Sequence, residues 1–190
     1  MTHVTILFIV TWLPQFSGVE MKRNSLAERY CPIARSAVEL VDAWTFVVLR
    51  EMFLNNRKFD GLQQQTGMSP RSLAIRLGQL VEAGILERRP YCEAPLRNEY
   101  HLTAKGLELW PVVIALKQWG DKWVGPWGRS GLPLQLEHKG HAHTLTLQWT
   151  CGECGESVSA NSATAHMSDK LKHERASLAA QKSSRTRSKG

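Results

Sequence analysis

Residues 60–84 read DGLQQQTGMSPRSLAIRLGQLVEAG, which combines two short helical patterns on either side of a Thr-Gly-Met turn. The second pattern starts strongly, because Ser69 offers a hydroxyl at the N-cap and Pro70 suits the first helical position. A stripe at helical spacing is expected to be buried, and it consists of Leu73, Leu77, Leu80 and Val81. Gly84 is expected to end this helix, where a left-handed residue is favoured.

The outer face of the second helix carries mainly side chains that donate hydrogen bonds, namely Arg71, Ser72, Arg76 and Gln79, beside the apolar Ile75. The first helix, residues 60–65, is expected to have Asp60 as its cap and to send Leu62 to the core. A short helix, a tight turn and a longer helix with a donor-rich face predict a helix-turn-helix. An ordinary helical hairpin with solvated charges is the alternative.

A β-hairpin is expected next. Residues 85–89 and 98–102 are short alternating runs around a proline-marked loop at 90–96. The side chains expected to face the core are Ile85, Tyr100 and Leu102, and those expected near the tip are Arg88, Arg89 and Arg97. Residues 57–59 are long enough only for a short edge strand. A helix-turn-helix followed by a basic hairpin predicts a winged helix, whose second helix enters the major groove of double-stranded DNA while the wing reaches phosphates or the minor groove.

Charge and composition agree only partly with DNA binding. The 190 residues are 43% hydrophobic and 22% charged, which is typical of a globular domain with appendages. The net charge is +7, but residues 169–190 hold seven Lys/Arg and two acids and so carry +5 of it. Residues 59–97 contain five arginines against four acids. The DNA-binding prediction therefore depends on where the arginines lie rather than on net charge.

Helices are also expected on both sides of this unit. One covers residues 32–41, and the next, residues 44–54, is capped by Asp42. The second of these is apolar on most of its surface, which predicts a central core helix that buries Trp44 and Phe46.

A last helix begins after Thr103, and Pro111 is expected to kink or break it. Beyond the proline, a seam recurs at coiled-coil spacing and consists of Val112, Leu116, Trp119 and Trp123. The seam could cover the domain's own core, but we favour a dimer seam, because Trp44 and Phe46 are expected to fill a core of this size.

A series of motifs spans residues 22–123: Cys31-Pro32-Ile33-Ala34-Arg35, Ala43-Trp44-Thr45, Leu49-Arg50-Glu51, Arg57-Lys58-Phe59-Asp60, Arg76-Leu77, Leu80-Val81-Glu82-Ala83-Gly84-Ile85-Leu86, Glu99-Tyr100-His101-Leu102-Thr103-Ala104-Lys105-Gly106 and Trp119-Gly120-Asp121. Together they resemble the HxlR-type winged-helix transcriptional regulators of bacteria. The resemblance implies a homodimer, joined through its first and last helices, that binds an inverted-repeat operator. It also implies a base-reading end of the recognition helix at Ser69, Pro70, Arg71, Ser72 and Arg76, and a wing that carries Arg88, Arg89 and Arg97.

The four cysteines form no regular disulfide framework, which favours a reducing, cytoplasmic environment. Proteins resembling this family include redox sensors that use the cysteine of the Cys-Pro step. Cys31 precedes a helix that starts at Pro32, and a thiol at a helix N-terminus can have a lowered pKa. Cys31 is therefore a candidate redox site, with a buried, inert thiol as the alternative. The regulator could respond to a small-molecule effector instead of to a redox signal.

Cys151-Gly152-Glu153-Cys154-Gly155 is half of a zinc knuckle. A closed tetrahedral site needs two more ligands, for which His141 and His143 are the candidates. A vestigial knuckle is favoured, so no cofactor is expected and zinc is the alternative.

The fold class expected is mainly α with a small β-hairpin wing (α+β), a winged helix-turn-helix followed by a Cys/His-containing module and a flexible tail. Residues 4–13 are apolar but too short to span a membrane, so no membrane association is expected. The expected domains are a non-native or disordered extension at 1–20, a DNA-binding and dimerisation domain at 21–124, a small β-rich module at 125–160 and a basic, largely disordered tail at 161–190.

No Ser-His-Asp arrangement, phosphate loop or paired catalytic carboxylates are apparent, so an enzyme is not expected. The rival interpretations are a metal-dependent enzyme or an interaction module built on the C-terminal Cys/His cluster. Metal in stoichiometric amounts with hydrolytic activity would favour the enzyme.

Overall fold

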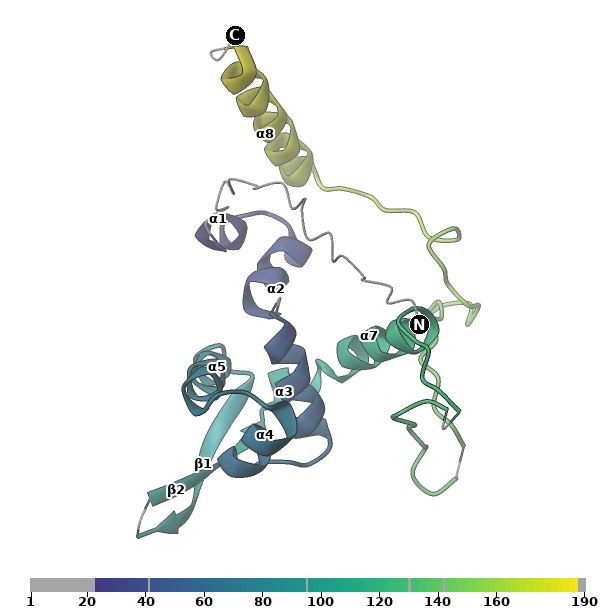
Figure 1. Ribbon diagram of the computed structural model, residues 1–190. Coiled ribbons are helices and arrows are strands. Elements are labelled where there is room, and N and C mark those ends of the chain that lie inside the picture. The colour runs from purple at the N-terminus through teal and green to yellow at the C-terminus, as the bar shows by residue number, and fades with distance from the viewer. Residues whose placement is uncertain (1–22, 41, 95, 130, 142, 188–190) are drawn as a thin grey trace, which may run out of the picture.

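The computed structural model describes residues 23–40, 42–94, 96–129, 131–141 and 143–187, so the expected 1–20 extension lies outside the described residues. The elements follow in the order α1 (Arg23–Ala27), α2 (Pro32–Leu40), α3 (Ala43–Phe53), α4 (Phe59–Thr66), α5 (Pro70–Glu82), β1 (Leu86–Glu93), β2 (Leu96–Leu102), α6 (Ala104–Leu107), α7 (Trp110–Trp123) and α8 (Asp169–Arg187). Helices α3, α4 and α5 gather around the antiparallel β1–β2 hairpin (Figure 1). We call this unit the winged core.

The hydrophobic core lies where these three helices meet the hairpin. From α3 and α4 it receives Val48, Leu49, Met52 and Leu62, and from α5 it receives Leu73, Leu77 and Leu80. The hairpin side adds Ile85, Leu86 and Tyr100, and all of these residues belong to one buried cluster. The stripe expected on the second helix is thus the face that α5 buries, with Val81 packed at its margin.

The expectation that Trp44 fills the core is wrong. Its side chain is exposed, Phe46 is only half-buried, and α3 instead buries Thr45 and the carboxylate of Glu51. A helix that is apolar on most of its surface has more apolar faces than the core can cover, so periodicity alone did not select the inner one. Glu51 is tolerated because the Arg50 guanidinium (Nε···Oε1 2.9 Å) and the Asn56 amide (3.2 Å) donate to it.

Three of the predicted helix caps are confirmed. Asp42 caps α3, Ser69 caps α5 and Thr103 caps α6, each by accepting a backbone N–H from the first turn. Gly84 is left-handed at φ 67° and follows Ala83, the C-cap of α5. The prediction of Asp60 as a cap is wrong: α4 begins at Phe59 after Lys58, which makes no side-chain cap. Asp60 lies in the first turn instead, where its charge still favours the helix N-terminus.

The hairpin strands are longer than expected and continue through most of the proline-marked segment. Pro90 lies inside β1, at a register shift between Pro90 and Cys92 where β1 has one residue more than β2. A bulge tolerates proline because the missing N–H is not needed there. The expected edge strand is a single bridge from Lys58 to Glu99, supported by the Tyr100 N–H donating to the Arg57 carbonyl at 2.9 Å.

Pro111 breaks the last helix of the expected domain, as predicted. Residues 104–107 form α6, and the chain resumes at Trp110 with Pro111 in the first turn of α7. Gly106 is buried where α6 passes the Ile85 carbonyl, and a Cβ at this position would collide with that oxygen. Ile114 faces the core side of α7, whereas the expected seam is exposed at every position, namely Val112, Leu116, Trp119 and Trp123. The seam therefore does not cover the core of its own chain.

The segment after α7 differs from the β-rich module expected at 125–160. Its described residues contain only two isolated antiparallel bridges, Glu137 to Thr144 and Thr150 to Ser157. The expected disordered tail contains the 19-residue helix α8. Glu174 of α8 accepts the Tyr30 backbone N–H at 3.0 Å, and Lys170 Nζ lies 4.4 Å from the centre of the Tyr30 ring. Among the described helices, none has both the length and the apolar content to cross a bilayer.

Candidate nucleic-acid interface

The N-terminal end of α5 is exposed and rich in hydrogen-bond donors. The Ser69 hydroxyl accepts the Ser72 N–H at 3.1 Å and donates to the Ser72 hydroxyl at 2.8 Å, which fixes the first turn. Pro70 occupies the first helical position. Arg71, Ser72 and Gln79 are exposed as predicted. The Arg71 side chain makes no ion pair or hydrogen bond within the described part of the chain. A helix N-terminus with a free arginine beside it is suited to anionic phosphate or to a guanine edge.

Arg76 does not lie on this exposed face, which corrects the sequence prediction. Its guanidinium forms an ion pair with Asp42 at 2.6 Å, and 14% of its side chain is exposed. The sequence spacing places Arg76 beside the buried stripe, and the Asp42 carboxylate draws it across α5 toward the start of α3. The positions of α5 that are free to meet a partner are therefore fewer than the sequence indicated.

The wing holds its three predicted arginines at different places. Arg88 and Arg89 lie along β1 opposite Tyr100 and Glu99, and only Arg97 lies near the tip, opposite Cys92. All three are exposed. The expectation that all three cluster at the tip is wrong, because the strands extend past Pro90.

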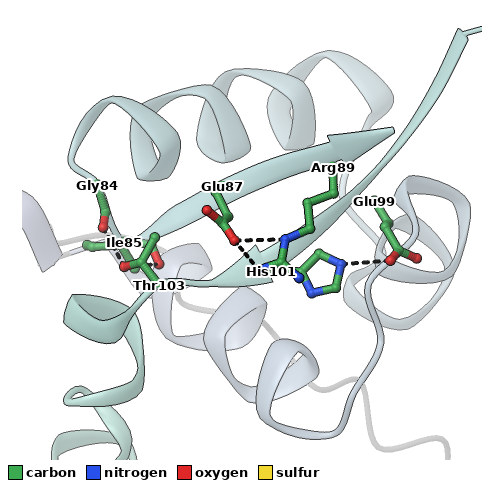
Figure 2. A network of polar contacts seen from close by, with 7 residues as sticks. All are labelled: Gly84, Ile85, Glu87, Arg89, Glu99, His101 and Thr103. Atoms are coloured by element: carbon green, nitrogen blue, oxygen red, sulfur yellow. Dashed lines mark hydrogen bonds and ion pairs between the residues drawn. The ribbon is translucent and has the colours of Figure 1, made fainter. Parts of the chain in front are cut away.

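Two of the wing arginines have partners on the hairpin itself. The Arg89 Nε donates to Glu87 Oε1 at 2.8 Å on the hairpin face where His101 contacts Glu99 at 2.7 Å (Figure 2). Arg88 lies over the Tyr100 ring, 5.9 Å from its centre. Arg97 has no ion pair or hydrogen bond among the described residues and is the most available cation of the wing.

Lys58 adds a cation to this side that sequence reasoning missed. Its backbone forms the isolated antiparallel β-bridge with Glu99 of β2, and its Nζ lies 4.7 Å from the centre of the Tyr91 ring. The only sequence signal was its place in the short edge strand, which did not specify which side of the hairpin it would join.

Cysteines occur in two of the predicted sites, the redox site at Cys31 and the metal site near the C-terminus. Cys31 is half-buried directly before α2, and its carbonyl accepts the Arg35 N–H at 3.1 Å. At the other end of the chain, His141 stacks between His138 and His143, with ring centres 4.7 and 6.1 Å apart. Among the described residues, no group of three or more His, Cys, Asp or Glu side chains is placed to hold a metal ion. His141 and His143 therefore do not join Cys151 and Cys154 in a four-ligand set.

The Cys151–Cys154 turn has the local form of a knuckle. Gly155, left-handed at φ 73°, donates to the Cys151 carbonyl at 2.9 Å. The pKa of the Cys151 thiol is lowered, mainly because the backbone N–H of Cys154 and then that of Glu153 donate to the sulfur, with a further contribution from the Cys154 thiol. These donors stabilise the thiolate.

Comparisons with known proteins match the winged core and its flanks. A model of the HxlR-like helix-turn-helix family matches residues 39–127. Rv3095, an uncharacterised HTH-type transcriptional regulator of Mycobacterium tuberculosis, is 36% identical over 129 residues, which cover 67% of this chain and 80% of that protein. The HTH-type regulator sll1512 of Synechocystis is 43% identical over 96 residues, covering 50% of this chain and 70% of that protein.

Two solved structures share the arrangement. PA1607, a candidate transcription factor, is similar with a TM-score of 0.68 and 28% identity, covering 76% of this chain and 99% of that chain. PA1374 from Pseudomonas aeruginosa, described in the same terms, is similar with a TM-score of 0.52 and 31% identity, covering 73% of this chain and 93% of that chain.

Proposed function

Since the chain belongs to the HxlR-like helix-turn-helix family of transcriptional regulators, we propose that it acts as a homodimer on an inverted-repeat operator. The recognition helix α5 enters the major groove, and the wing contacts the backbone. The observation that carries the proposal is the division of α5 into two faces. One face is buried in the core through Leu73, Leu77 and Leu80, and the other presents exposed donors beside a hairpin that carries arginines.

In this proposal the two groups of residues have different tasks. Arg71, Ser72 and Gln79 read base edges, because an arginine can donate two hydrogen bonds to a guanine and a glutamine can pair with an adenine. Arg88, Arg89 and Arg97 contact phosphates, which position the domain without selecting sequence. Of these, Arg97 contributes most, because the carboxylate of Glu87 already neutralises Arg89.

The seam of α7 supports the homodimer. An exposed row of four apolar side chains that includes two tryptophans is costly in water, and a second copy of the same helix would cover it. In a two-fold dimer, two recognition helices would read half-sites about 34 Å apart.

Selection of bound duplexes from a random DNA pool tests the proposal, followed by titration at two salt concentrations. The wild type is expected to enrich an inverted repeat. Arg71→Ala should relax the preference at one base pair of each half-site, by about 1–3 kcal/mol. Arg97→Ala should weaken binding to all sequences alike. It should also reduce the slope of log K against log salt concentration by about the contribution of one phosphate contact per domain. Arg129→Ala, an exposed cation outside both elements, is the control. Binding without sequence preference would refute the proposal.

We further propose that an effector binds between α3 and α7. A cavity of about 570 Å³ lies there, and it is lined mainly by apolar side chains, among them Phe46, Val47, Leu54, Val113, Ile114, Leu116 and Trp127. Its charged groups are paired, Arg50 with Glu51 and Lys117 with Asp121. A neutral, aromatic small molecule fits this lining best, because it covers apolar surface and leaves both ion pairs intact.

The neutral fluorophore N-phenyl-1-naphthylamine is a direct probe of this cavity. Val47→Trp should fill the cavity and abolish the rise in fluorescence, whereas Ile75→Trp on the exposed face of α5 should leave it unchanged. Equal binding by both variants would exclude the cavity as the effector site.

A further inference from the structure

Two polar connections tie the recognition helix to the segment between α2 and α3. In the first, an Arg76 terminal nitrogen lies 2.6 Å from Asp42 Oδ2. In the second, Lys105 Nζ donates to Glu39 Oε2 at 2.8 Å and to the Ala83 carbonyl, at the C-cap of α5, also at 2.8 Å. Asp42 and Glu39 flank the step from α2 to α3, so both connections end at the same place in the chain.

The Asp42–Arg76 contact differs from an ordinary surface ion pair. The other oxygen of Asp42, Oδ1, accepts the Trp44 N–H at 2.9 Å as the N-cap of α3, which fixes the orientation of the carboxylate. Arg76 is mostly buried, and within the described residues its Nε is a buried donor with no partner. Leaving a donor unsatisfied costs free energy. A side chain that only needed solvation would turn outward and avoid that cost.

Apolar packing does not hold α2 on the winged core in the way that it holds α5. No residue of α2 is buried, although Leu40 at its end packs against the core cluster. Helices α1 and α2 extend from the start of α3 away from the hairpin (Figure 1). The described contacts that hold α2 beside α5 are therefore the packing of Leu40 and the two polar connections, of which Lys105–Glu39 is an exposed ion pair.

We propose that Arg76 is a positioning residue, and that the Asp42–Arg76 and Glu39–Lys105–Ala83 contacts form a two-point joint that sets the angle of α2 relative to α5 and the winged core. Arg76 and Ala83 are seven residues apart, or about 10 Å along the helix. One contact fixes only a position, whereas two contacts this far apart fix a direction. The inference deepens the proposed function, on which it rests: in the dimer, this joint sets the distance between the two recognition helices and hence the preferred half-site spacing.

The test compares two readouts that a base-reading arginine and a positioning arginine would move differently. Inverted repeats are offered with spacers that vary one base pair at a time, and bases within the half-site are varied separately. Asp42→Asn removes the charge but keeps a good N-cap, and Arg76→Met keeps most of the apolar stem. Each should reduce a spacing preference of tenfold or more to about threefold, with base preferences unchanged. The double variant should resemble either single variant, because both break one interaction. Arg76→Lys should restore much of the preference.

A second measurement needs no DNA and uses the full chain. Hydrogen exchange of the α2 backbone amides should become several-fold faster in both Asp42→Asn and Arg76→Met, and remain at the wild-type rate in Arg71→Met, an exposed arginine on the same helix. Because this measurement uses no DNA, it separates failure of the joint from failure of the proposed function if the wild type selects no inverted repeat.

Two results would overturn the inference. Loss of preference at one base pair in Arg76→Met but not in Asp42→Asn would make Arg76 a base reader. Unchanged α2 exchange in both variants would show that the pair does not hold α2.

Discussion

Replacement of Trp119 by alanine is the most direct test of the dimer seam. The Trp119 side chain lies in the second half of α7 and keeps 58% of its surface exposed in the single chain. Because most of the indole is not covered by the described residues of its own chain, its loss should leave the fold intact. If a second copy covers the seam, the same substitution should weaken association strongly.

The magnitude follows from the exposed area. A tryptophan covers about 150–250 Å² when buried, so about 120 Å² of Trp119 remains for a partner to cover. At about 25 cal/mol per Å², complete coverage contributes about 3 kcal/mol per chain. A two-fold dimer counts the contact twice, which gives an upper bound of about 6 kcal/mol. Partial coverage halves this figure, and about 3 kcal/mol corresponds to a Kd of dimerisation about 100-fold weaker.

Sedimentation equilibrium over a wide concentration range measures that Kd directly. Trp149→Ala is a matched control, because Trp149 is 63% exposed but lies outside α7. Thermal unfolding should show that Trp119→Ala is folded. The reasoning is refuted if Trp119→Ala dimerises as tightly as the wild type, or if Trp149→Ala dissociates to the same extent.

Three further predictions concern the cap, the close contact and the thiol. Gly106→Ala should destabilise the fold by about 1–3 kcal/mol in urea unfolding, because its Cβ collides with a backbone carbonyl. Gly78→Ala meets nothing within 4 Å and should stabilise α5 by up to ~1 kcal/mol; equal destabilisation by both would contradict this. Ser69→Ala should cost about 1 kcal/mol in the same assay, and an unchanged midpoint would exclude the cap. Because its pKa is lowered from 9.0, Cys151 should stay reactive to iodoacetamide at lower pH than an ordinary thiol. Cys154→Ala should shift its alkylation profile to higher pH, and an unmoved profile would argue against the thiol contact.

Local signals predicted the helix-turn-helix well. The signals at the two ends of α5 act on the backbone of their own helix, so they can be recognised without knowing the tertiary structure. They are Ser69 with Pro70 at the start and Gly84 at the end. The same is true of Pro111, whose missing N–H breaks a helix wherever that helix lies.

The features that were mispredicted depend on neighbours distant in sequence. Trp44 was expected to be buried but is exposed, because its burial depends on which face of α3 meets α5 and the hairpin. A helix that is apolar on most of its surface does not indicate which face that is. Arg76 was assigned to the outer face because its guanidinium is a hydrogen-bond donor, yet it borders the buried stripe and pairs with Asp42, 34 positions earlier. Such a pairing becomes visible only when the start of α3 is placed against α5.

The bulge at Pro90 bears on how these molecules behave when crowded. Strand β1 lies at the outer edge of a two-stranded sheet, and a continuous edge of this kind is a template for another strand. Pro90 removes one N–H from the edge, the register shift bends it, and Arg88 and Arg89 place charge along it. A second wing is therefore expected not to extend the sheet in register, and neighbouring copies at high concentration are expected to remain separate instead of joining into a fibre.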